Sequence, residues 1–220
     1  MDNAYILSHV DHTLLKATAT WPEISQLCED AIKYNTASVC IPPHYVKRCR
    51  KTFSKLNICT VIGFPLGYDV TASKAAAAKA AIEDGADELD MVINITDVKN
   101  DAYDDIRTEI ETLKKIAGTR ILKVIVETCY LTETEKATLC RVVTEAGADY
   151  IKTSTGFGTG GATMDDINIF KAHIGKDVKI KASGGIRTRE DMEKYIEAGC
   201  SRLGTSSAIS ILSEGKADSY

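Results

Sequence analysis

The chain contains 220 residues, of which 44% are hydrophobic, 26% charged and 6% aromatic, a composition typical of a folded globular protein. Its 27 lysines and arginines against 31 aspartates and glutamates give a formal net charge of −4, which argues against nucleic acid and membrane surfaces as partners. No apolar run approaches the roughly 18 residues that a spanning helix needs, and the first residues do not resemble a signal peptide. We therefore expect a soluble cytoplasmic protein.

Short aliphatic or β-branched runs of strand length recur through the chain. They cover residues 37–41, 58–62, 88–93, 121–126, 150–153, 178–182 and 202–205, and the segment HVDHT at 9–13 supplies an eighth. Helical patterns lie between them, for example Ile24, Leu27, Cys28 and Ala31, which have the spacing of one buried helix face. Strand and helix therefore alternate.

Short sequence patterns mark both ends of the predicted helices. Three glycines that each precede an incoming strand, Gly85, Gly147 and Gly199, are typical of helix ends. A Thr-x-x-Glu/Asp sequence places a hydroxyl and a carboxylate where free N–H groups need acceptors, and four such sequences begin at Thr20, Thr132, Thr163 and Thr188.

Eight βα units predict an α/β fold, a single closed (β/α)8 TIM barrel over residues 1–220 with a flexible C-terminal tail at about 214–220. An open doubly wound sheet is the alternative. The sequence GFGTGG at 156–161 matches the dinucleotide fingerprint, but it comes late in the chain. About twenty residues on stands Lys181 instead of an acidic ribose ligand, so we expect no dinucleotide cofactor.

Seven cysteines are spread along the chain without a C-x-x-C pair, which favours free thiols in a reducing compartment. The close histidine pair, His9 and His12, has no second half-site of matching spacing, so we expect no metal ion. Cys40 has no recognisable histidine partner, and we interpret it as a buried small apolar side chain.

Active sites of such barrels lie at the C-terminal ends of the strands, where this chain is rich in lysine and carboxylate. Asp11, Lys123 and Glu127 are among these residues, and Asp90 lies on the opposite face of its strand from Leu89 and Met91. Asp90 has two interpretations: a proton-transfer group, or simply the partner of a lysine in a buried ion pair.

Lys152 and Lys181 lie on consecutive predicted strands. If both point inward, two ammonium groups about 6 Å apart repel by roughly 3 kcal/mol at an effective dielectric constant of about 20, equivalent to about two pKa units. One amine would then be neutral and could attack a carbonyl carbon to form a Schiff base, with Asp90 moving the protons. The alternative is that each lysine is an ordinary solvent-facing residue.

The last two βα turns read SGGIR and GTSSAI, and small residues that enter helices are suited to an anion. Gly184 and Gly185 allow close backbone approach, and Arg187 adds charge. Ser206 and Ser207 add hydroxyl donors. These turns predict a phosphorylated substrate, although ordinary tight turns have a similar composition.

Taken together, YIKTSTGF, KIKASGGIR, ELDMVIN, VDHTLL, IGFPLG, LKVIVET and the closing GTSS resemble the deoxyribose-phosphate aldolases over nearly the whole chain. That resemblance implies a metal-free and cofactor-free (β/α)8 barrel. It implies reversible cleavage of 2-deoxy-D-ribose 5-phosphate to D-glyceraldehyde 3-phosphate and acetaldehyde, a step of deoxyribonucleotide breakdown. It also implies Lys152 as the Schiff-base lysine, Lys181 as its perturbing neighbour and Asp90 as the proton donor and acceptor.

The same resemblance assigns a mobile C-terminal tyrosine to Tyr220, and it implies a homo-oligomer, either a dimer or a tetramer. Phe157 departs from longer family members, which carry a lysine there, so phosphate affinity would depend more on Arg187. Lys123 is a further candidate. The phosphate and substrate contacts implied are Thr13, Gly156, Gly184, Gly185, Arg187, Gly204, Ser206 and Ser207.

Two other functions remain open from the sequence. One is a different phosphosugar lyase or isomerase on the same barrel, which would keep the anion-binding turns but need no neutral lysine. The other is a noncatalytic phosphosugar-binding protein.

Overall fold

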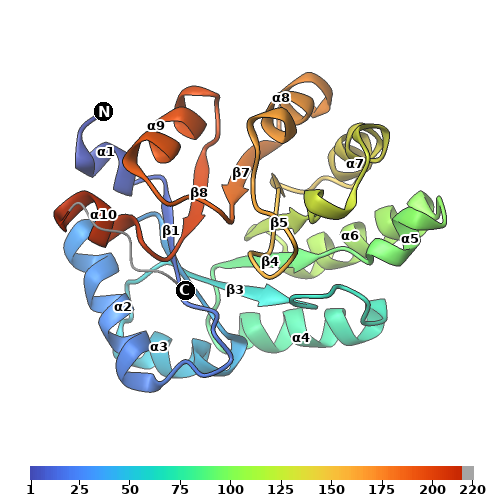
Figure 1. Ribbon diagram of the computed structural model, residues 1–220. Coiled ribbons are helices and arrows are strands. Elements are labelled where there is room, and N and C mark those ends of the chain that lie inside the picture. The colour runs from blue at the N-terminus through green and yellow to red at the C-terminus, as the bar shows by residue number, and fades with distance from the viewer. Residues whose placement is uncertain (215–220) are drawn as a thin grey trace.

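The computed structural model describes residues 1–214, and its strands close into one parallel barrel in sequence order, with β8 pairing with β1 (Figure 1). The closure excludes the open doubly wound sheet. The strands are β1 (Val10–Thr13), β2 (Ser38–Ile41), β3 (Ile58–Ile62), β4 (Glu88–Val92), β5 (Ile121–Ile125), β6 (Tyr150–Lys152), β7 (Lys179–Ser183) and β8 (Arg202–Thr205).

Helices surround the strands (Figure 1), and the short helix α1 packs against α9 and α10. None of the helices within residues 1–214 is both long and apolar enough to cross a membrane. The helices are α1 (Asn3–Leu7), α2 (Trp21–Tyr34), α3 (Val46–Thr52), α4 (Thr71–Glu83), α5 (Ile95–Lys99), α6 (Tyr103–Ala117), α7 (Glu133–Glu145), α8 (Met164–His173), α9 (Arg189–Glu197) and α10 (Ala208–Glu214), with 3-10 turns η1 (Pro43–Tyr45) and η2 (Thr128–Tyr130).

The predicted helix boundaries are confirmed by their hydrogen bonds. At the start of α7, Thr132 N donates to Glu135 Oε2 at 2.6 Å and Glu135 N donates to Thr132 Oγ1 at 3.3 Å. Gly147 ends the same helix at φ +73°, a conformation that residues with a Cβ rarely adopt. Reciprocal capping of the same kind begins α2, α8 and α9.

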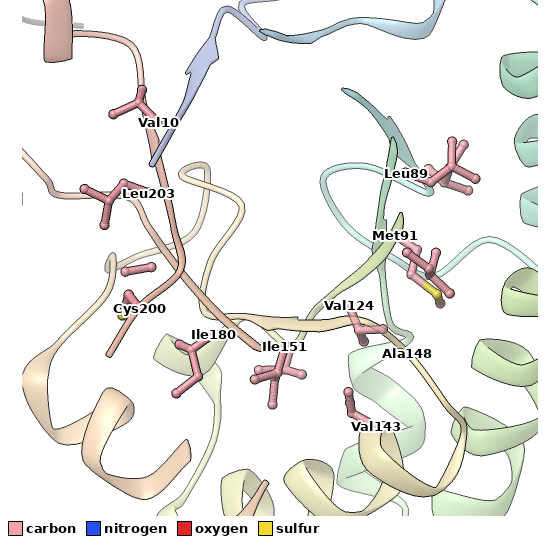
Figure 2. Close-up of a cluster of buried hydrophobic side chains, with 14 of the residues drawn as sticks. Val10, Leu89, Met91, Val124, Val143, Ala148, Ile151, Ile180, Cys200 and Leu203 are labelled. Carbon is pink, nitrogen blue, oxygen red and sulfur yellow. The ribbon is translucent and has the colours of Figure 1, made fainter. Parts of the chain in front are cut away.

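Alternation along each strand separates two environments. Figure 2 shows Leu89, Met91, Val124 and Ile180 on the outer side of their strands, where they belong to the hydrophobic core between barrel and helices. Asp90 lies between Leu89 and Met91 in sequence and faces the other way, into the barrel. The barrel interior is therefore polar at the level where the predicted lysines lie.

Candidate active site

The buried carboxylate of Asp90 on β4 meets three lysine side chains inside the barrel. Its Oδ2 atom accepts hydrogen bonds from Lys152 Nζ at 2.8 Å and Lys181 Nζ at 2.7 Å, and its Oδ1 atom accepts one from Lys123 Nζ at 2.9 Å. Burial raises the pKa of the Asp90 carboxyl, but the ammonium groups lower it more, so the net shift is well below the usual range. Asp90 is therefore ionised at neutral pH and able to accept a proton.

Lys181 is held between two carboxylates. Its Nζ atom donates to Asp11 Oδ2 at 2.5 Å as well as to Asp90. Burial lowers the pKa of Lys181, but Asp11 and Asp90 raise it more, so its pKa lies above the ordinary lysine value. The sequence pattern predicts two ammonium groups beside one carboxylate, and the structure adds Asp11 as a second carboxylate beside Lys181. Lys181 is the amine that stays protonated.

A deeper layer of charges continues the network below Asp90. Lys123 Nζ donates to Glu88 Oε2 at 2.5 Å, and Arg202 binds both Glu88, at 2.9 Å, and Asp11. Four cations, Lys123, Lys152, Lys181 and Arg202, are thus joined by ion pairs to three carboxylates, Asp11, Glu88 and Asp90. The network carries one positive charge in excess when all seven groups are ionised.

Lys152 has the fewest contacts of these cations. Its one ion pair within the described residues is to Asp90, through an oxygen that Lys181 also occupies. Its side chain retains 4% exposure, whereas those of Lys123 and Lys181 are fully buried. The network therefore holds Lys152 least firmly and leaves its amine the most accessible.

Glu127, at the end of β5, organises the loop that follows Lys152. Its carboxylate accepts hydrogen bonds from the Thr155 hydroxyl and from Thr155 N at 3.2 Å, and its backbone has φ +55°. Burial raises the pKa of the Glu127 carboxyl, while the Thr155 hydrogen bonds and the Lys152 charge oppose that shift and only partly cancel it. The sequence identified Glu127 as a strand-end carboxylate but gave no sign of this contact.

The turn after β7 packs against the loop after β6. Ala162 N donates to Ser183 O at 3.0 Å and to Gly184 O at 3.1 Å. A Cβ added to Gly161 would lie 2.3 Å from the Gly184 carbonyl, so this contact requires glycine. Gly156, Gly184 and Gly185, which the sequence analysis assigns to a phosphate site, all have positive φ and lie in these two segments.

Ser154 is a residue that the sequence analysis missed. Its side chain is fully buried, and its hydroxyl has no hydrogen-bond partner within the described residues. A Cβ on Gly184 would lie 3.6 Å from Ser154 Cβ, which places Ser154 beneath the predicted phosphate turn. A buried hydroxyl without a partner is a candidate for contact with a bound substrate.

Gly204 lies inside the barrel beside Lys181. A Cβ at this position would meet Ser183 Cβ at 2.8 Å and Lys181 Cε at 3.2 Å. Because Gly204 has no side chain, β8 leaves space at this position for the aliphatic part of Lys181. The sequence pattern does not predict this role for Gly204.

Three other predicted residues line one cavity between α2 and α10. It has a volume of about 690 Å³, and Thr13, Ser206 and Ser207 contribute to its wall together with His12. The Ser207 N–H already donates to Thr205 Oγ1 at 3.2 Å, whereas His12 Nδ1 has no partner within residues 1–214. The structure thus places the two serines together at the end of β8, but in a different hollow from the lysine cluster.

The remaining predicted residues are dispersed. Arg187 is exposed after the Gly184 turn, and its backbone N–H donates to Asp191 at 3.1 Å. Phe157 is 53% exposed and packs edge-on against Phe64, with ring centroids 5.3 Å apart. Tyr220 lies outside the described residues, as does nearly all of the predicted tail at 214–220.

Comparison with known proteins gives concordant matches. The model of the DeoC/LacD family aldolases matches residues 5–212. A deoxyribose-phosphate aldolase of Clostridium botulinum (strain Alaska E43 / Type E3) is 60% identical, with 100% of both chains covered. A deoxyribose-phosphate aldolase of Clostridioides difficile is 58% identical over 98% of this chain and 99% of its own.

A solved structure of an aldolase also matches this chain. The tetrameric deoxyribose phosphate aldolase from Aeropyrum pernix superposes with a TM-score of 0.90 at 30% identity, covering 96% of this chain and 91% of its own. The predicted resemblance and the predicted barrel are both confirmed. The chain belongs to the DeoC/LacD family of aldolases.

Proposed function

We propose that this chain is a deoxyribose-phosphate aldolase that reversibly cleaves 2-deoxy-D-ribose 5-phosphate to D-glyceraldehyde 3-phosphate and acetaldehyde. The names of its full-length relatives support the substrate. The observation that carries the mechanism is the contact of Lys152 Nζ and Lys181 Nζ with the same oxygen of Asp90. This contact brings together a nucleophile (Lys152), a fixed positive charge (Lys181) and a proton acceptor (Asp90).

Attack on the substrate aldehyde requires an unprotonated amine. The network has one cation more than it has carboxylates, so it can release one proton and become neutral overall. Lys152 is the amine with the fewest partners and the most exposure, and we assign it as the nucleophile. Its nitrogen bonds to C1 of the open-chain sugar to form a carbinolamine. The carbinolamine hydroxyl takes up one proton, from the Lys181 ammonium or from solvent, and leaves as water, so that a protonated imine remains.

Cleavage of the C2–C3 bond follows from the imine. The C3 hydroxyl gives up its proton, the C3–O bond becomes the new aldehyde, and the C2–C3 electron pair moves toward the positively charged imine to form an enamine. Asp90, which is ionised, accepts the proton directly or through Lys181. Returning it to C2 and hydrolysing the imine releases acetaldehyde and the free lysine.

The phosphate group would bind at the turn after β7. Gly184 and Gly185 expose backbone at positive φ, Arg187 supplies a positive charge nearby, and the Ser154 hydroxyl beneath has no other partner within residues 1–214. Gly156 belongs to the adjoining loop. The family resemblance also implies Ser206, Ser207 and Thr13, which line the separate cavity between α2 and α10.

We also propose that the chain assembles as a homo-oligomer, since the aldolase from Aeropyrum pernix is described as tetrameric. A dimer or a tetramer fits this relationship. Light scattering of the purified protein measures the assembly, and a monomer at micromolar concentration would contradict it.

Trapping the imine tests the proposed chemistry. The protein is incubated with acetaldehyde and sodium borohydride, digested with trypsin and weighed. We expect one added ethyl group on the peptide containing Lys152, with Lys179, an exposed lysine on the adjacent strand, as the internal control. A noncatalytic binding protein, or an isomerase that uses no amine, would leave the Lys152 peptide unmodified.

A further inference from the structure

Inside the barrel, two cysteines lie beside the proposed catalytic carboxylate. Cys40 on β2 and Cys59 on β3 are direct partners in the parallel ladder, and both are fully buried, as the sequence predicts for Cys40. The Cys59 thiol donates to Asp90 Oδ1 at 3.1 Å. One atom from each side chain, two sulfurs and one carboxylate oxygen, lies within 4.8 Å of the other two.

We propose that Cys40, Cys59 and Asp90 form a binding site for a thiophilic d10 dication, Zn²⁺ or Cd²⁺, and that occupancy of this site inhibits the enzyme. Two thiolates and one carboxylate are a donor set that such ions bind tetrahedrally, with a fourth position left for water. Sulfur ligands on a tetrahedral zinc ion lie about 3.8 Å apart, since each Zn–S bond is about 2.3 Å. Side-chain adjustments of about 1 Å therefore suffice to close the site.

Charge balance permits a dication despite the nearby lysines. Binding one ion to two thiols releases two protons, so the charge of the barrel interior does not change. Lys123 Nζ donates to Cys59 Sγ at 3.4 Å and favours the thiolate, but burial, Cys40 and Asp90 outweigh it and hold the pKa of the Cys59 thiol well above its usual value. The dication itself must therefore displace the thiol protons. A hard ion such as Mg²⁺ prefers oxygen ligands and is not expected to compete.

Occupancy would act through Asp90. An ion at this site would bind Oδ1, the oxygen next to Cys59, and would displace the Lys123 ammonium that donates to it at 2.9 Å. The same carboxylate accepts hydrogen bonds from Lys152 and Lys181 through Oδ2. A dication on this group withdraws its negative charge from both amines and prevents it from accepting a proton. This inhibition rests on the proposed aldolase function, whereas the binding itself does not.

Cadmium ion is the probe, because thiolate-to-cadmium charge transfer absorbs in the ultraviolet. We expect one tight Cd²⁺ per chain, release of about two protons per ion in weak buffer, and reversal by a chelator. Mg²⁺ should give neither signal. Wild-type protein that shows no charge-transfer absorption at stoichiometric Cd²⁺ would overturn the proposal.

The chain provides a matched control pair of thiols. Cys28 and Cys49 lie with their sulfurs 3.8 Å apart between α2 and α3. Among residues 1–214, no third histidine, cysteine or carboxylate lies close enough to complete a metal-binding group with them. We expect Cys59→Ala and Cys40→Ala each to weaken Cd²⁺ binding at least about a hundredfold, as loss of a thiolate ligand implies. The double variant Cys28→Ala/Cys49→Ala should retain it. The reverse pattern would place the ion elsewhere and overturn the assignment.

Activity is measured on the same samples, each relative to its own metal-free rate, after circular dichroism has shown that the variant is folded. We expect inhibition to follow site occupancy in wild type and in the control double variant. Full occupancy at Cys40 and Cys59 with unchanged turnover would refute the inhibitory role. If metal-free wild type has no aldolase activity, the proposed function fails, while the binding result still decides the metal site.

Discussion

Lys152 and Lys181 lie opposite each other on β6 and β7, and their ammonium groups donate to the same oxygen of Asp90, at 2.8 Å and 2.7 Å. Lys181 has a second carboxylate, Asp11, and Lys152 does not have one among the described residues. The two lysines are therefore distinguished by their partners. This difference supports our proposal that Lys181 is a fixed cation and Lys152 the reactive amine.

Replacing Lys152 by arginine tests whether an amine or only a positive charge is needed. Arg keeps the charge beside Asp90 but is not deprotonated in proteins and forms no comparable imine. We expect cleavage of 2-deoxy-D-ribose 5-phosphate to fall at least roughly a thousandfold, about 4 kcal/mol in the activation barrier. A coupled assay for D-glyceraldehyde 3-phosphate measures the rate, with Lys179→Arg as control. Undiminished turnover would refute the assignment of Lys152.

Replacing Asp11 by asparagine removes a carboxylate from a network that already has an excess cation. The excess then grows from one to two, which favours loss of a proton from the network. We expect the pH at which borohydride traps half of the maximum amount of imine to fall by at least about half a unit. The control is Asp104→Asn, whose side chain is 90% exposed. A shift to higher pH would contradict the charge count.

The same substitution has a cost in stability. Among the described residues, Lys181 would retain only the shared oxygen of Asp90 as an ion-pair partner, and breaking a buried ion pair costs about 3–5 kcal/mol. Urea denaturation of Asp11→Asn measures this loss. The trapping comparison is made at a temperature where the variant remains folded.

Substitutions in the predicted phosphate site should separate binding from chemistry. Arg187→Ala removes a charge-assisted contact, and we expect KM for 2-deoxy-D-ribose 5-phosphate to rise about tenfold, equivalent to about 1.4 kcal/mol. Unphosphorylated 2-deoxy-D-ribose should be affected little. Phe157→Lys adds a charge where longer family members have one, and it should lower KM. An equal effect of Arg187→Ala on both sugars would argue against a phosphate contact.

His12 predicts a pH-dependent stability. It is 6% exposed, and burial lowers its pKa from 6.5 to about 4, with Asp30 opposing the shift. The unfolded chain therefore binds more protons than the folded one between these values. The contribution of His12 is complete above pH 6.5 and is lost as the pH falls toward 4, by up to about 3 kcal/mol.

Urea denaturation across this interval checks the prediction for His12. The free energy of unfolding is measured for wild type and for His12→Gln, whose residue 12 does not titrate. The wild-type value should fall more steeply with decreasing pH than that of the variant. Parallel curves would show that folding does not lower the pKa of His12.

Deleting Tyr220 tests a role that the resemblance to the aldolase family implies for the last residue. We expect slower proton exchange at C2 of the bound acetaldehyde, measured by deuterium incorporation, with KM for the phosphorylated sugar nearly unchanged. A comparable loss in both would point to substrate binding instead of proton transfer.

The barrel could be predicted because its signals are local. Threonine and glutamate three residues apart begin α7, and a glycine ends it, in the sequence and in the structure alike. Strand alternation likewise separates Asp90 from Leu89 and Met91. Each of these patterns involves neighbours within one element, so no knowledge of distant contacts is needed.

The charge network could be predicted only in part because its members meet by closure of the barrel. Asp11 reaches Lys181 from the other end of the chain, across 170 positions of sequence, once β1 has paired with β8. Cys40 and Cys59 become neighbours only through the register of β2 and β3. Spacing rules for metal sites do not detect such pairs, because they count residues along one segment.

The hydrogen bonds from Ala162 N to the carbonyls of Ser183 and Gly184 link the loop behind the reactive amine to the turn expected to hold the phosphate. A ligand whose phosphate binds the turn should therefore also restrict the motion of the loop. A ligand without a phosphate should leave both segments more mobile. Aldehydes without a phosphate should for this reason react more slowly even at saturating concentration, because binding energy remote from the cleaved bond contributes to orienting it.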